Sequence, residues 1–155
     1  MSQIVIRDYG NSDEDELIII HDLARPIELN GSCDPRAFVP LRNDSADLDE
    51  FRSCRKLVAC NDDQIHGFIG INDNEIGWLY VRPESSRRGI GQRLLNAAME
   101  SIQKSNDAST TVSVYVLDAN NPAIALYESR GFRIVETFGS RNNGYPCTLH
   151  KMLSV

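Results

Sequence analysis

The junction at residues 87–95, which reads RRGIGQRLL, most constrains how this chain can fold. An apolar run, EIGWLYV at 75–81, precedes the junction, and apolar residues at helical spacing follow it from Ile90 to Ile102. A buried strand therefore runs into an amphipathic helix through two arginines and two glycines. Glycines let the backbone approach a ligand closely, and a helix N-terminus carries roughly half a positive charge. By themselves these residues predict either an anion site or a tight turn with solvated arginines.

Hydrophobic periodicity divides the rest of the chain into strands and helices. Strands are expected at 3–9, 55–61, 64–71, 75–81, 110–117, 132–138 and 145–153. Helices are expected from Ser12 to Arg25 or Leu29, at 46–55, at 89–103 and at 122–130. The polar turns 61–63 and 72–74 make the three middle strands an antiparallel meander. This order predicts an α/β fold of the α+β type, in which helices cover both faces of a central, mostly antiparallel sheet.

Smaller signals refine the helix ends and the loops. Pro26 is expected to kink or end the first helix, and residues 30–45 hold two prolines without a clear period, which is typical of a long loop. Asn121 can cap the last helix with Pro122 in its first turn, and Gly131 suits a left-handed helix end.

Composition limits the classes of function. The 155 residues suit a single domain spanning 1–155, and the net charge of −6 argues against nucleic-acid binding. No apolar run is long enough for a membrane span, and the start lacks a signal-peptide layout, so we expect a cytoplasmic protein without a membrane partner, either a monomer or a homodimer. The cysteines and histidines lack zinc-ligand spacing, so we expect reduced thiols and no metal. These residues are Cys33, Cys54, Cys60, Cys147, His21, His66 and His150.

Two motifs, in order and at suitable spacing, carry a family resemblance. Residues 86–91 read SRRGIG, and residues 120–132 read NNPAIALYESRGF. The chain resembles the GCN5-related N-acetyltransferase (GNAT) family, whose acetyl-CoA signature is Gln/Arg-x-x-Gly-x-Gly/Ala and whose second block is Asn-x-x-Ala-x-x-x-Tyr-x-x-x-Gly-Phe. Ser86 departs from the usual first residue, and Arg87 can substitute as its neighbour. A Walker loop and a dinucleotide fingerprint both fit the junction poorly, because the Gly-Lys-Ser/Thr ending and the third glycine are missing.

The resemblance implies transfer of an acetyl group from acetyl-CoA to a primary amine of a small molecule or protein, by direct attack in a ternary complex. Backbone amides would hold the pyrophosphate at Arg87, Arg88, Gly89, Ile90, Gly91 and Gln92. The cofactor arm would pair with the strand edge at Leu79, Tyr80, Val81 and Arg82, where a backbone N–H polarises the acetyl carbonyl. The Arg82 side chain either reaches a phosphate or is solvated, while Trp78 and Tyr80 suit the core or a groove wall.

The resemblance also implies the chemical roles. Tyr127 would give a proton to the leaving thiolate, although its spacing also suits an aromatic residue packed before Gly131. Asn120 would contact the cofactor arm or cap a turn. Glu75, 14 positions before Gly89, matches the general-base slot of the histone-acetylating branch; the alternatives are a solvated hairpin glutamate and a base made of ordered water. Asp73 and His66 are weaker candidates, and His66 suits cross-strand packing.

The acceptor is the part that the sequence leaves open. The first helix, the loop 30–45 and the last strands are expected to build its pocket. Acidic residues could attract a cationic amine there, but a solvated helix face is the simpler interpretation. These residues are Asp13, Glu14, Asp15, Glu16, Asp22 and Glu28. A cofactor sensor without turnover is the alternative function, and a dinucleotide enzyme would require NAD(P) to stabilise the fold.

Overall fold

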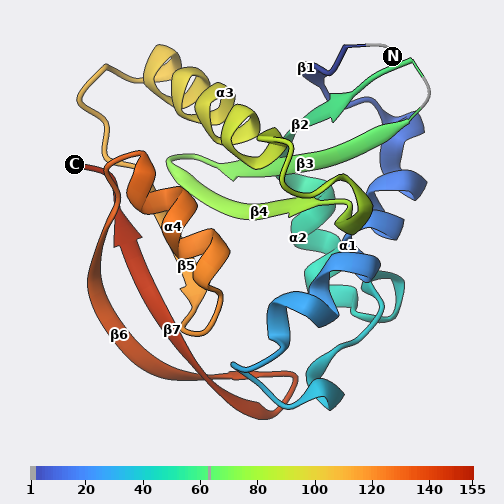
Figure 1. Cartoon of the computed structure of the whole chain (residues 1–155), viewed down its shortest axis with the longest axis vertical. Coiled ribbons are helices and arrows are strands. Elements are labelled where there is room, and N and C mark those ends of the chain that lie inside the picture. Colours follow the sequence, from blue (N-terminus) through green and yellow to red (C-terminus); the bar gives the residue numbers. More distant parts are fainter. Residues whose placement is uncertain (1–2, 63) are drawn as a thin grey trace.

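The computed structural model describes residues 3–62 and 64–155 as a seven-stranded sheet with helices packed on it (Figure 1). The elements in chain order are β1 (Val5–Asp8), α1 (Glu14–Leu29), α2 (Ser45–Ser53), β2 (Arg55–Cys60), β3 (Ile65–Asn72), β4 (Glu75–Val81), α3 (Ile90–Ser105), β5 (Ser113–Leu117), α4 (Asn121–Ser129), β6 (Arg133–Asn142) and β7 (Tyr145–Leu153). This order confirms the predicted one. Asp63, in the predicted turn between β2 and β3, lies outside the described residues.

The sheet order is β1-β2-β3-β4-β5-β7-β6, and β4 and β5 are its only parallel pair among the described residues. The predicted mostly antiparallel sheet is confirmed. Only Glu75–Ser113 and Ile76–Val114 are in register between β4 and β5. Beyond them β4 continues alongside β3 with a bulge at Gly77, because Trp78 faces Gly70 while Ile76 faces Ile71. The sheet is therefore open between β4 and β5 toward the end of β4.

Side chains of β4 alternate between two hydrophobic clusters on opposite faces of the sheet. Leu79 and Val81 pack with the cluster that contains α3 and α4 residues. Trp78 and Tyr80 pack with the cluster that contains residues of α1 and α2. Helices thus cover both faces, as predicted (Figure 1).

Several local features differ from the sequence prediction. Pro26 does not end α1, because the helix continues through this residue to Leu29. The loop 30–45 contains two 3-10 turns, Pro35–Ala37 and Leu41–Asn43. Asn120, rather than Asn121, caps α4. Among the described residues, no helix combines the length and apolar character that crossing a membrane requires.

Candidate active site

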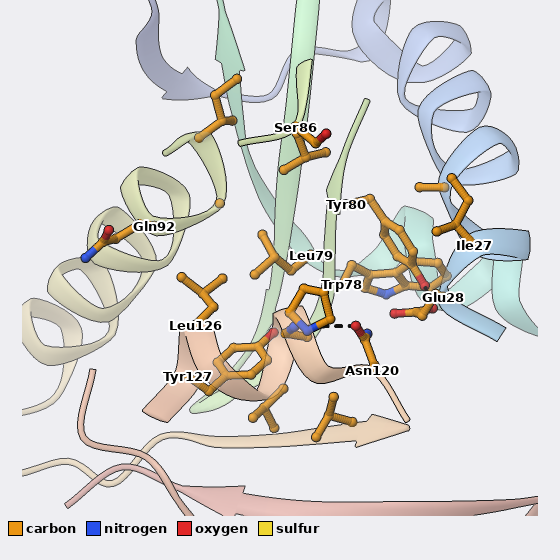
Figure 2. A pocket seen from close by; sticks show the side chains of 18 of the residues that line it. Ile27, Glu28, Trp78, Leu79, Tyr80, Ser86, Gln92, Asn120, Leu126 and Tyr127 are labelled. Atoms are coloured by element: carbon orange, nitrogen blue, oxygen red, sulfur yellow. Dashed lines mark hydrogen bonds between the residues drawn. The ribbon is translucent and has the colours of Figure 1, made fainter. Parts of the chain in front are cut away.

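A cavity of about 770 Å³ occupies the opening between β4 and β5 (Figure 2). Its walls come from β4, β5, the end of α1, the start of α3 and the segment from Ala119 through α4. The volume lies within the range of about 300–1,000 Å³ that is usual for small-molecule sites. Because β4 and β5 diverge here, the cavity touches both the α1 side and the α3 side of the sheet.

The junction before α3 forms one end of this cavity. Arg87 has φ +64° and Gly89, the N-cap residue, has φ +74°, so two left-handed residues lie within three positions. Such alternation directs successive backbone N–H groups into a concave site for anions. The first backbone hydrogen bond of α3 runs from the Arg93 N–H to the Gly89 carbonyl at 3.1 Å. The N–H groups of the first turn therefore remain available to a ligand. Arg87 and both glycines of the sequence pattern thus line the cavity beside these N–H groups.

The backbone of β4 offers further donors along the cavity. The Arg82 N–H bonds to the His66 carbonyl of β3 at 2.7 Å. Alternate residues of an antiparallel strand point their N–H groups the other way, so Leu79 and Val81 direct theirs toward β5. At this level β5 no longer pairs with β4. The opening therefore exposes a strand edge to which an extended ligand can add.

Tyr127 of α4 lines the cavity and is 4% exposed. Its ring packs on Phe132, with centroids 5.4 Å apart. Burial, and secondly the negative charge of Glu28, raise the pKa of Tyr127 above its ordinary value of about 10. The phenol is therefore a neutral hydrogen-bond donor throughout the physiological pH range.

Asn120 caps α4 and also lines the cavity. Its Oδ1 accepts a hydrogen bond from the Ala123 N–H at 3.4 Å, which caps α4 (Figure 2). The same side chain lines the cavity near Tyr127. Because the cap uses Oδ1, the Nδ2 group is left to donate to a ligand.

Glu28 is the one of the six acidic residues named in the sequence analysis that lines the cavity. It lies at the end of α1, lines the cavity and accepts a 2.9 Å hydrogen bond from the Tyr80 hydroxyl. Arg25 forms an ion pair with the same carboxylate. Glu28 is therefore not part of a solvated helix face. Ala24 and Ile27 also line the cavity, and their spacing puts them on the same face of α1 as Glu28. This helical spacing is the sequence signal that could have identified Glu28.

Comparison with known proteins places the chain in a family. A family model described as an acetyltransferase (GNAT) domain matches residues 52–134. The chain belongs to the GNAT acetyltransferase family. It is therefore an acetyltransferase by family, as predicted, and its sheet and helices are those of the GNAT fold. No curated protein sequence matches the chain.

Solved structures share this GNAT fold at low identity. A GCN5-related N-acetyltransferase from Rhodopseudomonas palustris is 19% identical with a TM-score of 0.84, over 99% of this chain and 96% of that one. PaiA N-acetyltransferase from Thermoplasma acidophilum, solved with coenzyme A, is 22% identical with a TM-score of 0.77, over 98% of each chain. YncA from Salmonella typhimurium, a putative acetyltransferase solved with its cofactor acetyl-CoA, is 16% identical with a TM-score of 0.73, over 98% and 93%.

The structure brings most of the predicted GNAT site residues to one cavity. The predicted residues that line it are Leu79, Tyr80, Val81, Arg87, Gly89, Ile90, Gly91, Gln92, Asn120 and Tyr127. Glu75, Arg82 and Arg88 are not among the lining residues. Glu75 lies at the closed end of the opening, in register with Asn72 and Ser113.

The Arg82 side chain is neither solvated nor directed at a phosphate site. It is 9% exposed and donates to the Ile65 carbonyl at 3.1 and 3.2 Å and to Glu16 Oε2 at 3.1 Å. These bonds tie the end of β4 to β3 and α1. Its backbone is paired as well, because the N–H bonds to the His66 carbonyl and the carbonyl accepts from the Ser85 N–H at 2.8 Å. Arg82 therefore has a structural place at the end of β4.

His66 is buried, as the packing interpretation expected, and its Nδ1 lies 2.7 Å from the Ser85 hydroxyl oxygen. Ser85 lines the cavity just before the junction, whereas His66 does not. The histidine therefore supports the loop rather than facing a ligand.

Proposed function

We propose that the chain transfers the acetyl group of acetyl-CoA to a primary amine of a small molecule or a protein, by direct attack in a ternary complex. The observation that carries this proposal is one continuous cavity, which joins the anion site before α3, the open edge of β4 and the buried phenol of Tyr127. A cavity with these three parts matches an extended, phosphate-bearing acyl donor. The neutral amine attacks the thioester carbonyl carbon of acetyl-CoA, and a C–N bond replaces the C–S bond. The nitrogen loses one proton and the leaving sulfur gains one, so that the products are an amide and the coenzyme A thiol.

The cavity residues fit this donor. Backbone N–H groups from Arg87 to Gln92 would hold the diphosphate, since a helix N-terminus favours anions. A Cβ built on Gly89 meets no atom within 4 Å, so this glycine keeps the approach to the loop backbone open. The Leu79 and Val81 N–H groups would pair with the amide-bearing arm and polarise the acetyl carbonyl. One such oxyanion donor is worth about 3 kcal/mol.

Tyr127 would donate its phenolic hydrogen to the sulfur as negative charge develops there. Its raised pKa keeps the hydroxyl protonated, but it also makes full proton transfer to a thiolate of ordinary pKa about 8.5 more unfavourable. The role that suits Tyr127 is therefore a hydrogen-bond donor that strengthens in the transition state. Glu75 lies outside the cavity lining. Water rather than Glu75 would therefore take the proton that the acceptor ammonium releases before its nitrogen attacks.

Labelled acetyl transfer, with two matched variants, tests this function. Isotope-labelled acetyl-CoA is incubated with the protein and an extract of amines and proteins, and labelled products are identified by mass spectrometry. Gly89→Asp places a negative charge in the anion site and is expected to weaken cofactor binding by about 100-fold, since like charges brought together cost several kcal/mol. Aspartate tolerates left-handed backbone, so the variant is expected to fold.

Gly144→Asp is the control, because Gly144 has φ +86° in the turn between β6 and β7 and lines no part of the cavity. We expect labelled product from the wild type and from Gly144→Asp, and none above background from Gly89→Asp. If the wild type binds acetyl-CoA in calorimetry but labels nothing, turnover is contradicted and a cofactor sensor is favoured. Equal cofactor affinity in all three proteins would show that the junction before α3 is a turn and does not bind the cofactor.

A further inference from the structure

Charge is distributed unevenly around the cavity. Among its lining residues in the described part of the chain, two side chains carry a charge at neutral pH, Arg87 and Glu28. Arg87 belongs to the anion site before α3, whereas Glu28 comes from α1. Since α1 and α3 pack on opposite faces of the sheet, the cavity is positive on one side and negative on the other.

The Glu28 carboxylate is held in a fixed position. Tyr80 donates its hydroxyl to Oε1, and Arg25 forms its ion pair with the same oxygen. The Glu28 side chain is 23% exposed. Two donors on Oε1 leave Oε2 with its lone pairs for a ligand in the cavity. A carboxylate prepared in this way suits a charge-assisted hydrogen bond to a cation.

The surroundings of Glu28 are largely apolar. Figure 2 shows Ile27, Trp78 and Tyr80 gathered with Glu28 on the α1 side of the cavity. Trp78 is 7% exposed, and its Nε1 has no hydrogen-bond partner among the described residues. This nitrogen is itself closed to solvent, so the part of Trp78 that lines the cavity is apolar. The α1 side of the cavity therefore combines one carboxylate with apolar and aromatic walls.

We propose that Glu28 binds the ammonium group of the acetyl acceptor, and that this acceptor is a primary amine without a carboxylate on its amine-bearing carbon. This inference rests on the proposed function, because it assigns the acceptor half of the same cavity. Acetyl donor and acceptor would then enter from opposite faces of the sheet and meet at the opening between β4 and β5.

The exclusion of a carboxylate follows from the charges that face this region. An acceptor carboxylate would lie close to Glu28, and like charges at short range repel each other. Arg25, the neighbouring cation, does not line the cavity and is already paired with Glu28. A neutral amide in the same place adds no charge and is not repelled by Glu28. Free amino acids are therefore poor acceptors, whereas alkylamines and amide-capped amines are good ones.

Glu28 also faces the candidate acid across the cavity. Its negative charge contributes, after burial, to the raised pKa of Tyr127. An acceptor ammonium bound to Glu28 would therefore lie across the cavity from Tyr127. The bound ammonium releases one proton to water, and its neutral nitrogen then attacks the acetyl carbonyl between the two groups.

Three acceptors that differ in one group give the test. Norleucine is pentylamine with a carboxylate on the amine-bearing carbon, and norleucinamide carries a neutral amide there instead. We expect the wild type to acetylate pentylamine and norleucinamide with a kcat/KM at least about tenfold above that for norleucine. Steady-state rates with acetyl-CoA give kcat and KM for each amine.

Glu28→Gln keeps an oxygen that can accept from Tyr80 but removes the charge. We expect it to raise KM for pentylamine about 10- to 100-fold, as for loss of a charge-assisted bond, with kcat changed less than about threefold. Asp15→Asn is the matched control, because Asp15 is an acidic residue near the other end of α1 that does not line the cavity. It removes the same charge from the same helix and is expected to leave both constants unchanged.

Each outcome decides between the two proposals. An unchanged KM for pentylamine in Glu28→Gln would remove Glu28 from acceptor binding, and a wild type that prefers norleucine would overturn the acceptor class. Labelled products from the extract without acetylation of any of the three probes would also overturn the acceptor class while acetyl transfer stands. No product from either source would instead contradict the proposed function itself.

Discussion

Tyr127 illustrates how a single residue can be both a packing residue and a chemical group. Its ring packs on Phe132 in the core, and its hydroxyl belongs to the cavity wall. Burial raises its pKa, and the charge of Glu28 adds to the effect. The hydroxyl is therefore retained as a donor at every pH at which the protein is expected to work.

Tyr127→Phe keeps the ring and removes the hydroxyl. We expect kcat to fall by about 100-fold, because the hydrogen bond that strengthens at the sulfur in the transition state is lost, while acetyl-CoA affinity changes less than about twofold. Tyr115→Phe is the control, since Tyr115 of β5 also lines the cavity but is 43% exposed. Stopped-flow and calorimetry provide the two quantities. A kcat of Tyr127→Phe equal to that of the wild type would leave Tyr127 a packing residue only.

Residue types and spacing predicted the cavity residues that belong to a local backbone pattern or motif. They failed for side chains whose positions depend on residues distant in sequence. The glycine junction and Tyr127 follow from local patterns. Arg82 does not, because Glu16 and the Ile65 carbonyl that hold it are distant in sequence. Glu28 was predicted to be solvated for the same reason, since Tyr80 of β4 determines its position.

At the scale of elements, β1 is linked to the turn that opens α1. Arg7 donates to both carboxylate oxygens of Asp13 at 2.8 and 3.0 Å, and the Gly10 N–H bonds to Asp13 Oδ2 at 2.8 Å. The Arg7 hydrogen bond is the largest cause of the lowered pKa of Asp13. A carboxyl with a lowered folded-state pKa stabilises the fold above its ordinary pKa of about 3.9. That stabilisation is lost as pH falls through the folded-state value.

Arg7→Met tests this link through its pH dependence. We expect a loss of about 1 kcal/mol in the free energy of unfolding at pH 7, since Arg7 is partly exposed and solvent screens the pair. The difference from the wild type is expected to shrink below pH 4 as Asp13 becomes protonated. Urea unfolding at pH 7 and pH 3 measures both values. A loss that is equal at the two pH values would show that Arg7 acts through packing alone.

The order of elements was predictable because strand and helix periods differ along the chain. What periodicity could not predict is the short parallel pairing of β4 with β5, which ends after Ile76. Backbone pairing requires no particular side chain there, so no sequence pattern marks the opening. Likewise, the continuation of α1 through Pro26 depends on packing against β3 and β4, which outweighs local propensity.

At the scale of the whole molecule, the opening in the sheet lets elements from both faces contribute to one cavity. The anion site comes from the α3 side, Glu28 comes from the α1 side, and the edge of β4 lies between them. The central claim is that a coenzyme A molecule occupies the α3 side along this edge. Amide hydrogen exchange reports that contact residue by residue, because a bound ligand slows exchange of the N–H groups that it pairs with.

The most direct measurement is therefore amide exchange followed by NMR, with and without coenzyme A. The account predicts slower exchange at Leu79, at Val81 and across 89–92, with little change at the turn 142–145. The contradicting result is unchanged exchange at these amides together with protection at the hollow between β1 and α3, where Arg7, Arg55 and Lys104 lie. That outcome would place the coenzyme on another surface and leave the cavity without its assigned ligand.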